Sequence, residues 1–155
     1  MSGSGPSPIL PEGVPSDGSS AGWLPPHLLA VAIGGAIGAL LRHFVNHHAG
    51  SLMPEHPERA TLLVNAVGSI AMGCLLAWAV HRPDHLSPML HTGITVGLLG
   101  ALTTYSTFST DALKLLHAGR GFDAALYVVL TTVLCIAGAA GGYALMTVLL
   151  ARPTT

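Results

Sequence analysis

Charged residues are scarce in this chain of 155 residues: they make up 8% of it, whereas hydrophobic residues make up 50%. Soluble domains carry about 25% charged residues, so this inventory cannot cover a water-exposed surface. The formal net charge of −1 also leaves no basic patch to neutralise phosphates, which excludes nucleic acid as a partner. The composition therefore predicts an integral membrane protein.

Cysteine is scarce as well, and Cys74 and Cys135 both lie inside apolar runs. Cysteines placed in this way are more typical of small packing residues than of a disulfide framework or a metal pair. Nine histidines are present, and His43, His47 and His48 fall near one helical face. No acidic residue or cysteine completes a ligand set beside them, so we interpret them as polar residues where a span meets water. We recognise no nucleophile–base pair, metal-activated water or phosphate loop, and we therefore expect no enzyme activity.

The apolar sequence is long enough for four membrane-spanning helices of about 20 residues each. Residues 1–24 are Gly, Ser and Pro with few apolar residues, which predicts a disordered tail without the basic start and apolar core of a signal peptide. Residues 25–152 then form an all-α transmembrane domain with both termini on one side. The expected spans are residues 27–47, 60–80, 88–117 and 124–150.

The third expected span contains residues 103–110, TTYSTFST, in which seven of eight side chains carry a hydroxyl. Unpaired donors are costly at membrane depth, so this cluster indicates an ion or substrate path. The alternative is a surface Ser/Thr loop. Glycines at 93, 97 and 100 precede the cluster, and the combination predicts two short helices, 93–102 and 106–116, separated by a break. Such a break is tolerated only where the freed backbone is buried or lines a wet cavity.

Basic residues of the loops are divided evenly between the two sides of this four-span arrangement, whereas counting Arg42 and Lys114 near helix ends as well gives two against four. Loops on the side of the termini hold Arg82 and Arg152, and loops on the opposite side hold Arg59 and Arg120. The positive-inside rule therefore gives little direction. A protein that inserts in both orientations, and so forms an antiparallel dimer, needs such a weak bias. The alternative is a single orientation set by a slight excess of charge.

Polar and aromatic residues of the expected helices describe a site for a small, strongly hydrated anion. Asn65 and Thr61 lie one turn apart on one face, and an Asn offers two N–H donors. Tyr105 and Phe108 also share a face, and an aromatic ring has a positive edge that can face an anion. Carbonyl groups freed at the break near Gly100 can coordinate a cation such as Na⁺.

Each of these features also has a structural alternative. Asn65 is suited to clamp two helices together, and the two aromatic rings to plain packing. Arg42 follows an apolar run and can extend its guanidinium to the membrane interface. Asp111 and Lys114, three residues apart, can form an ion pair on a helix face.

Two other functions compete with an anion path for the whole chain. A small proton-coupled multidrug transporter needs a carboxylate deep in a span, and Asp111 is the candidate. A non-transporting assembly subunit would be held together by the small-residue face of the fourth span, which contains Gly138, Gly141 and Gly142. The assembly function leaves the hydroxyl cluster unexplained.

Three stretches resemble the Fluc (CrcB-type) fluoride channels: residues 34–42 (GGAIGALLR), 61–69 (TLLVNAVGS) and 97–111 (GLLGALTTYSTFSTD). The resemblance extends over residues 27–150. It implies a dual-topology homodimer with two antiparallel pores in the inner (plasma) membrane, which exports fluoride passively and so relieves its toxicity. Some genomes encode paired homologues, so a paralogous subunit is an alternative partner.

The same resemblance implies roles for individual residues. Backbone carbonyls of Gly100 and Thr103 from both subunits would hold a central structural Na⁺. Tyr105 and Phe108 would occupy the family's two phenylalanine positions beside the fluoride path, and Arg42 would lie near the pore mouth. The other residues implied to line the path are Thr61, Asn65, Ser106, Thr107, Ser109, Tyr127 and Thr131, with Cys135 at the end of the polar face of the fourth span.

The chain departs from the family's pattern at four positions. Ala101 replaces the second glycine of a pair, which crowds the turn at the break. Tyr105 replaces a phenylalanine and adds a hydroxyl. Asp111 replaces a glutamate and is one methylene shorter, and Cys135 replaces a hydroxyl residue with a weaker donor. These changes bear on the conduction rate and leave the resemblance intact.

Overall fold

A computed structural model describes residues 26–151 and, for residues 50, 52 and 84, only the backbone. The expected disordered tail, residues 1–24, lies outside the described residues. Within them the chain is helical and contains no strand. Among these residues three helices are long and apolar enough to cross a membrane, α1 (Pro26–Leu52), α2 (Glu58–His81) and α6 (Gly121–Ala151), whereas the sequence predicts four spans.

The sequence between α2 and α6 forms several short elements. A 3₁₀ turn, η1 (Pro83–His85), is followed by the continuous run of α3 (Pro88–Thr92), η2 (Gly93–Leu99) and α4 (Gly100–Leu102). The η2 segment is a π-helix, which the sequence analysis did not predict. Thr103 and Thr104 then adopt extended backbone conformations, with ψ values of 150° and 122°. Helix α5 (Tyr105–His117) begins directly after them.

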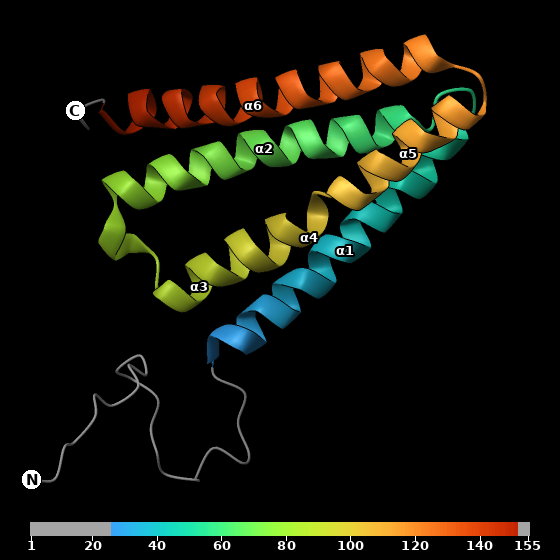
Figure 1. Cartoon of the computed structure of the whole chain (residues 1–155). Helices are drawn as coiled ribbons and strands as arrows, with labels where there is room; N and C mark the ends of the chain where they lie inside the picture. The colour runs from blue at the N-terminus through green and yellow to red at the C-terminus, as the bar shows by residue number, and fades with distance from the viewer. Residues whose placement is uncertain (1–25, 152–155) are drawn as a thin grey trace, which may run out of the picture.

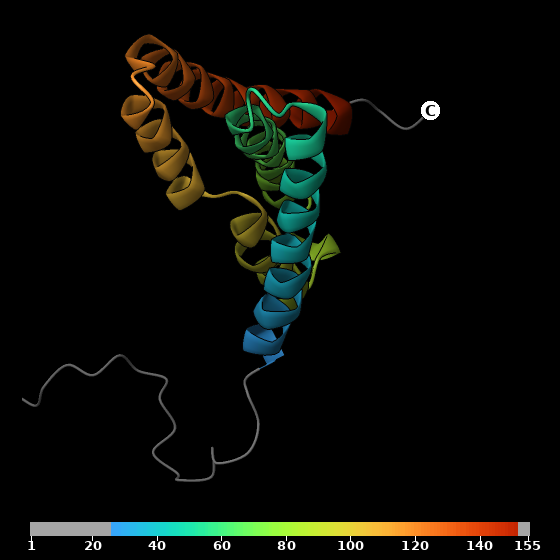
Figure 2. The ribbon, with the colours of Figure 1, turned by 90° about the vertical axis from the view of Figure 1, so that its right-hand side faces the viewer.

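The helices form two pairs (Figure 1). Helices α2 and α6 lie side by side and run in the same direction. Helix α1 lies along the run α3–η2–α4, and these also share one direction. Beyond the extended residues, α5 diverges from α1 and reaches the beginning of α6 (Figure 2). The two extended residues therefore redirect the chain from one helix pair to the other.

Local sequence explains where the shorter helices begin and end. The Ser87 side chain accepts the N–H of Leu90 at 3.3 Å, and proline occupies the first position of α3. The Thr104 hydroxyl accepts the N–H of Thr107 at 3.2 Å and so caps α5. Helix α5 ends at His117, and Gly119, two residues later, has a φ of +74°, a conformation that glycine adopts without steric cost.

Glycines allow both helix pairs to pack backbone against backbone. A Cβ atom on Gly73 would overlap the carbonyl oxygen of Ala139, and one on Gly142 would overlap that of Ile70. In the other pair, a Cβ on Gly34 or Gly38 would overlap a carbonyl oxygen of η2. Membrane helices associate through close packing of small residues rather than through hydrophobic burial. These contacts therefore hold together the two helices within each pair.

Replacing Gly142 by alanine should lower the stability of the protein by about 1–3 kcal/mol, because the new methyl group has no room beside α2. Gly141→Ala is the matched control, since no atom lies within 4 Å of its Cβ position. That variant should unfold at the wild-type temperature or above, because alanine favours a helix. Thermal unfolding of the detergent-solubilised protein measures both. Equal melting temperatures for the two variants would contradict this packing.

Candidate functional site

The side chain of Asn65 binds the backbone of the extended segment between α4 and α5. Its Nδ2 donates to the carbonyl oxygen of Thr104 at 3.1 Å, and its Oδ1 accepts the N–H of Thr104 at 2.8 Å. Both residues are buried. In a continuous helix the N–H of Thr104 would bond to the carbonyl of Gly100, four residues earlier. Asn65 takes that donor, so the Gly100 carbonyl loses its helical partner.

The hydroxyl groups of residues 103–110 are largely used in local hydrogen bonds. The Thr104 hydroxyl caps α5 and also lies 3.1 Å from the Ser106 hydroxyl and 3.3 Å from that of Thr107. Three hydroxyls donate to the carbonyl four residues earlier in the chain, those of Thr103, Ser109 and Thr110. The cluster thus stabilises the start of α5, and its hydroxyls can rotate toward a ligand only by giving up these bonds.

A pocket of about 520 Å³ lies beside the extended segment, between α2, the α4–α5 junction and α6. Its lining brings together several residues that the sequence analysis named, and it adds Ser69 and Thr132. The named residues in the lining are Asn65, Gly100, Thr103, Tyr105, Phe108, Thr131 and Cys135. Residues from three expected spans therefore meet at one place.

Three aromatic rings form a row at this pocket. The ring centroid of Phe108 lies 5.4 Å from that of Tyr105 and 5.4 Å from that of Tyr127. Phe108 and Tyr127 are buried in a core cluster with Leu115 and Ala124, whereas Tyr105 is 80% exposed. The row thus begins at the surface of the protomer and ends inside it.

Two hydroxyl groups of α6 are buried without a hydrogen-bond partner of good geometry among the described residues: Tyr127 Oη and Thr131 Oγ1. The two residues are one turn apart, so they share a face of the helix. Buried polar groups are nearly always hydrogen-bonded in proteins. Two orphaned hydroxyls on one face therefore indicate a place where a ligand or water completes the bonding.

Thr61, one turn before Asn65, donates to Asp111 Oδ2 at 2.8 Å. The other carboxylate oxygen accepts from Lys114 Nζ at 3.1 Å, which confirms the expected ion pair on the face of α5. The sequence analysis did not place Asp111 among the path residues. Its bond to Thr61 joins positions 50 residues apart, and no spacing rule within one helix predicts such a contact.

A second polar cluster, also missed by the sequence analysis, lies where the α1–α2 loop meets the turn between α5 and α6. His56 Nδ1 lies 2.9 Å from Glu58 Oε1 and 3.3 Å from Arg120 Nη2. Arg120 Nε donates to Asp123 Oδ2 at 2.7 Å. A pocket of about 130 Å³ lined by these four residues also contacts Tyr127. The cluster therefore adjoins the inner end of the aromatic row.

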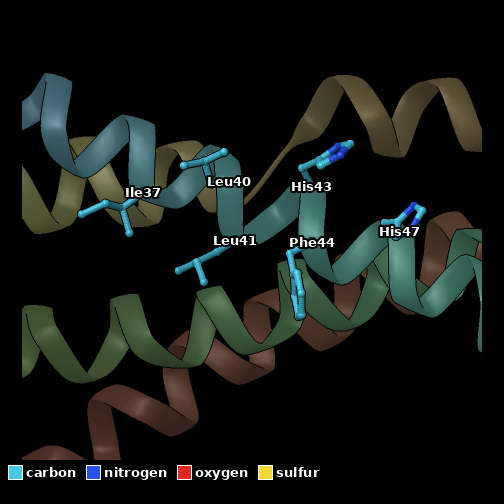
Figure 3. A pocket seen from close by; sticks show the side chains of 6 residues that line it. All are labelled: Ile37, Leu40, Leu41, His43, Phe44 and His47. Atoms are coloured by element: carbon cyan, nitrogen blue, oxygen red, sulfur yellow. The ribbon is translucent and has the colours of Figure 1, made fainter.

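Arg42 and the neighbouring histidines lie apart from these groups, on α1. Arg42 is half-buried and forms no hydrogen bond or ion pair with a described side chain, and it does not line the pocket beside Asn65. Figure 3 shows a separate pocket of about 510 Å³ on α1, whose lining is apolar except for His43 and His47. No group of three His, Cys, Asp or Glu residues suited to a metal occurs among the described side chains.

Comparison with known proteins assigns the chain to a family. Residues 29–143 match the family model described as CrcB-like protein, Camphor Resistance (CrcB). The chain is 44% identical over 110 residues to the fluoride-specific ion channel FluC of Shewanella sp. (strain ANA-3), a match that covers 71% of this chain and 87% of that protein. The FluC proteins of Shewanella baltica (strain OS185) and Shewanella oneidensis give the same identity and coverage. The chain therefore belongs to the CrcB family.

Proposed function

We propose that this protein is a fluoride channel of the inner (plasma) membrane that lets fluoride leave the cytoplasm passively and so relieves its toxicity. The observation that carries the proposal is the pocket beside Asn65, which combines the orphaned hydroxyl of Thr131 with the aromatic rings of Tyr105 and Phe108 in a chain whose relatives are named fluoride-specific channels. Fluoride is the anion of a weak acid that crosses membranes when neutral. An anion leak therefore suffices for export, and no catalysed reaction is required.

In this proposal the chain crosses the membrane four times. Helices α1, α2 and α6 are three of the spans, and the run from α3 to α5 is the third in chain order, broken at Thr103 and Thr104. The bonds from Asn65 to Thr104 support this arrangement, because a helix break at membrane depth must have its backbone groups satisfied by protein or water.

The functional unit is an antiparallel, dual-topology homodimer. The pocket of one protomer is open, Tyr105 at its rim is 80% exposed, and its lining contains amide and hydroxyl groups. Such groups do not face lipid, so a second copy is needed to cover them. The even distribution of arginines in the loops fits a protein that inserts in both orientations. A paralogous subunit would serve in the same way.

Fluoride moves along the face where α2, α5 and α6 meet. Neutral donors replace part of its water shell, and no lysine or arginine lines the pocket to trap it. The positive edges of Tyr105 and Phe108 contribute at the rim. The residues assigned to the path are Thr61, Asn65, Tyr105, Ser106, Thr107, Phe108, Ser109, Tyr127 and Thr131, with Arg42 at the pore mouth.

A structural Na⁺ at the centre of the dimer fits the residues present. The Gly100 carbonyl has lost its helical partner to Asn65, and Thr103 has an extended backbone whose carbonyl faces away from regular helix bonding. The carbonyls of Gly100 and Thr103 from both subunits would hold the ion, which would fix the two breaks against each other. Oxygen ligands of this type suit a hard cation.

Nothing favours the proton-coupled transporter. Its one candidate carboxylate, Asp111, accepts hydrogen bonds from Thr61 and Lys114 on its two oxygens. A carboxylate held in this way already has a donor on each oxygen. The relatives are also named ion channels rather than transporters.

The proposal is tested with purified protein in liposomes loaded with potassium fluoride, with valinomycin to balance charge and a fluoride electrode to follow release. Rapid efflux is expected, and vesicles loaded with potassium chloride should retain their anion. In an Asn65→Ala variant efflux should be lost or altered, and loss of efflux with a persistent dimer in Thr131→Val, which keeps the Asn65 bonds, separates a channel from an assembly subunit. Chloride release as fast as fluoride release, or no release from a well-folded dimer, would refute the proposal.

Replacing Thr131 by valine should slow fluoride efflux about tenfold or more, because the substitution keeps the shape and removes a buried donor that an anion would use. Thr132→Val is the matched control. Thr132 is exposed, and its hydroxyl already donates to the carbonyl of Val128 at 2.8 Å. Efflux through that variant should match the wild type. If both variants conducted alike, Thr131 would have no place on the path.

Removing Na⁺ should destabilise the dimer. A ligand that binds only the folded assembly raises its stability in proportion to the logarithm of its concentration. The melting temperature of the detergent-solubilised dimer should therefore rise as NaCl replaces N-methyl-D-glucamine chloride at constant ionic strength. An unchanged melting temperature across that exchange would remove the ion from the proposal.

A further inference from the structure

The cluster of His56, Glu58, Arg120 and Asp123 contains a contact whose donor and acceptor depend on where the His56 imidazole carries its protons. His56 Nδ1 lies within hydrogen-bond distance of a carboxylate oxygen and of a guanidinium nitrogen, at 2.9 and 3.3 Å. A nitrogen that carries a proton can donate to Glu58, whereas one that bears a lone pair can accept from Arg120. It cannot do both. The bonding at this nitrogen therefore depends on whether Nδ1 carries a proton, as it does in one neutral tautomer and always in the protonated imidazole.

The charged groups around this imidazole are balanced without it. Glu58 and Arg59 of α2 line the same pocket, as do Arg120 and, from the first turn of α6, Asp123, and the neighbouring pocket adds Asp111 and Lys114 of α5. Acidic and basic members are equal in number in this set. His56 therefore decides the sign: the cluster is neutral when the imidazole is neutral and positive when it is protonated. Histidine is the side chain that ordinarily changes charge between pH 5 and 8.

Partial burial of His56 and Glu58 strengthens the effect of the imidazole charge on its neighbours. The Glu58 side chain is only 10% exposed, so its carboxylate is held in place against the loop, and His56 is 33% exposed and reaches water. When the imidazole is protonated, Nδ1 donates to Glu58 and cannot accept from Arg120. The Nη2 group of Arg120 is then free to bind another acceptor, while its Nε stays on Asp123 at 2.7 Å.

The position of the cluster connects this change to the anion path. The pocket of about 130 Å³ that contains His56 and Arg120 is closed on its inner side by Tyr127, whose ring packs against Phe108. The neighbouring pocket contains Asp111, the partner of Thr61. An anion held by His56 and Arg120 would thus lie next to the first buried groups of the path.

We propose that His56 and Arg120 form an acid-activated binding site for small anions at one mouth of the pore, empty of net charge at neutral pH and positive when His56 is protonated. This inference rests on the proposed function and deepens it, because it assigns a pH dependence to fluoride capture. A positive mouth raises the local concentration of anions and their rate of arrival, and the effect declines with ionic strength. Capture therefore increases under acid conditions, when fluoride enters cells most readily as the neutral acid.

The test compares fluoride efflux from liposomes at about pH 7.5 and about pH 5.5, with equal pH inside and outside so that orientation does not matter. Protein-free vesicles at each pH give the leak of neutral acid, which is subtracted. Wild-type efflux should rise about threefold or more at the lower pH. His56→Gln should abolish the rise. His85→Gln is the matched control, an exposed histidine in the turn beyond the other end of α2, and it should respond to pH as the wild type does.

A variant with a permanent positive charge at position 56 provides the opposite comparison to His56→Gln. His56→Lys should conduct at about pH 7.5 as fast as the wild type does at about pH 5.5, and it should lose most of its pH dependence. A full acid response in His56→Gln, or equal wild-type rates at both pH values, would overturn the inference and leave the channel itself intact.

A binding measurement separates this inference from the proposed function. The His56 imidazole resonance, assigned by its loss in His56→Gln, should shift with potassium fluoride at about pH 5.5 and not at about pH 7.5. Potassium gluconate at equal concentration controls for ionic strength. No efflux at either pH, together with such a shift, would refute the channel and keep the anion site. An imidazole insensitive to fluoride under acid conditions would refute the site.

Discussion

The structure depends on the two hydrogen bonds between the Asn65 side chain and the backbone of Thr104. An extended segment inside an apolar helical protein leaves polar backbone groups that lipid cannot satisfy. The amide of Asn65 presents a donor and an acceptor in the geometry of a peptide group, so it substitutes for a turn of helix. The chain can then leave α1 and approach α6. The pocket, the exposed Tyr105 and the freed Gly100 carbonyl all follow from that change of direction.

Different residues pack the helices together and line the pocket beside Asn65. Glycines allow the backbones of α2 and α6, and of α1 and η2, to come into direct contact. The pocket beside Asn65, with the unsatisfied hydroxyl of Thr131, lies between the pairs. Rigid pairs keep these groups in register, because a close-packed interior does not deform continuously. The helix pairs therefore form two rigid sides, and the polar residues of the pocket lie between them.

The sequence predicted the parts of this structure that depend on local pattern. Apolar length predicted the long helices, hydroxyls and glycines predicted a change of conformation near Thr103, and i, i+4 spacing paired Thr61 with Asn65. Contacts between distant positions were not predictable. Nothing in the local pattern indicates that Asp111 meets Thr61 or that His56 meets Arg120. The π-helix was also missed, because it arises where glycines at 93 and 97 contact α1, and helix propensity does not record that packing.

The π-helix determines the angular position of the break at Thr103 and Thr104 around the axis of the preceding helix. Its hydrogen bonds reach back one residue further than those of an α-helix, so each of its turns holds an extra fraction of a residue. Over Gly93–Leu99 this shifts the angular register of everything that follows relative to the glycines packed on α1. Thr103 and Thr104 point toward Asn65 in that shifted register. Deleting one residue from the stretch would restore an ordinary helix and rotate the break away from its anchor, so the number of residues in this segment matters as much as their identity.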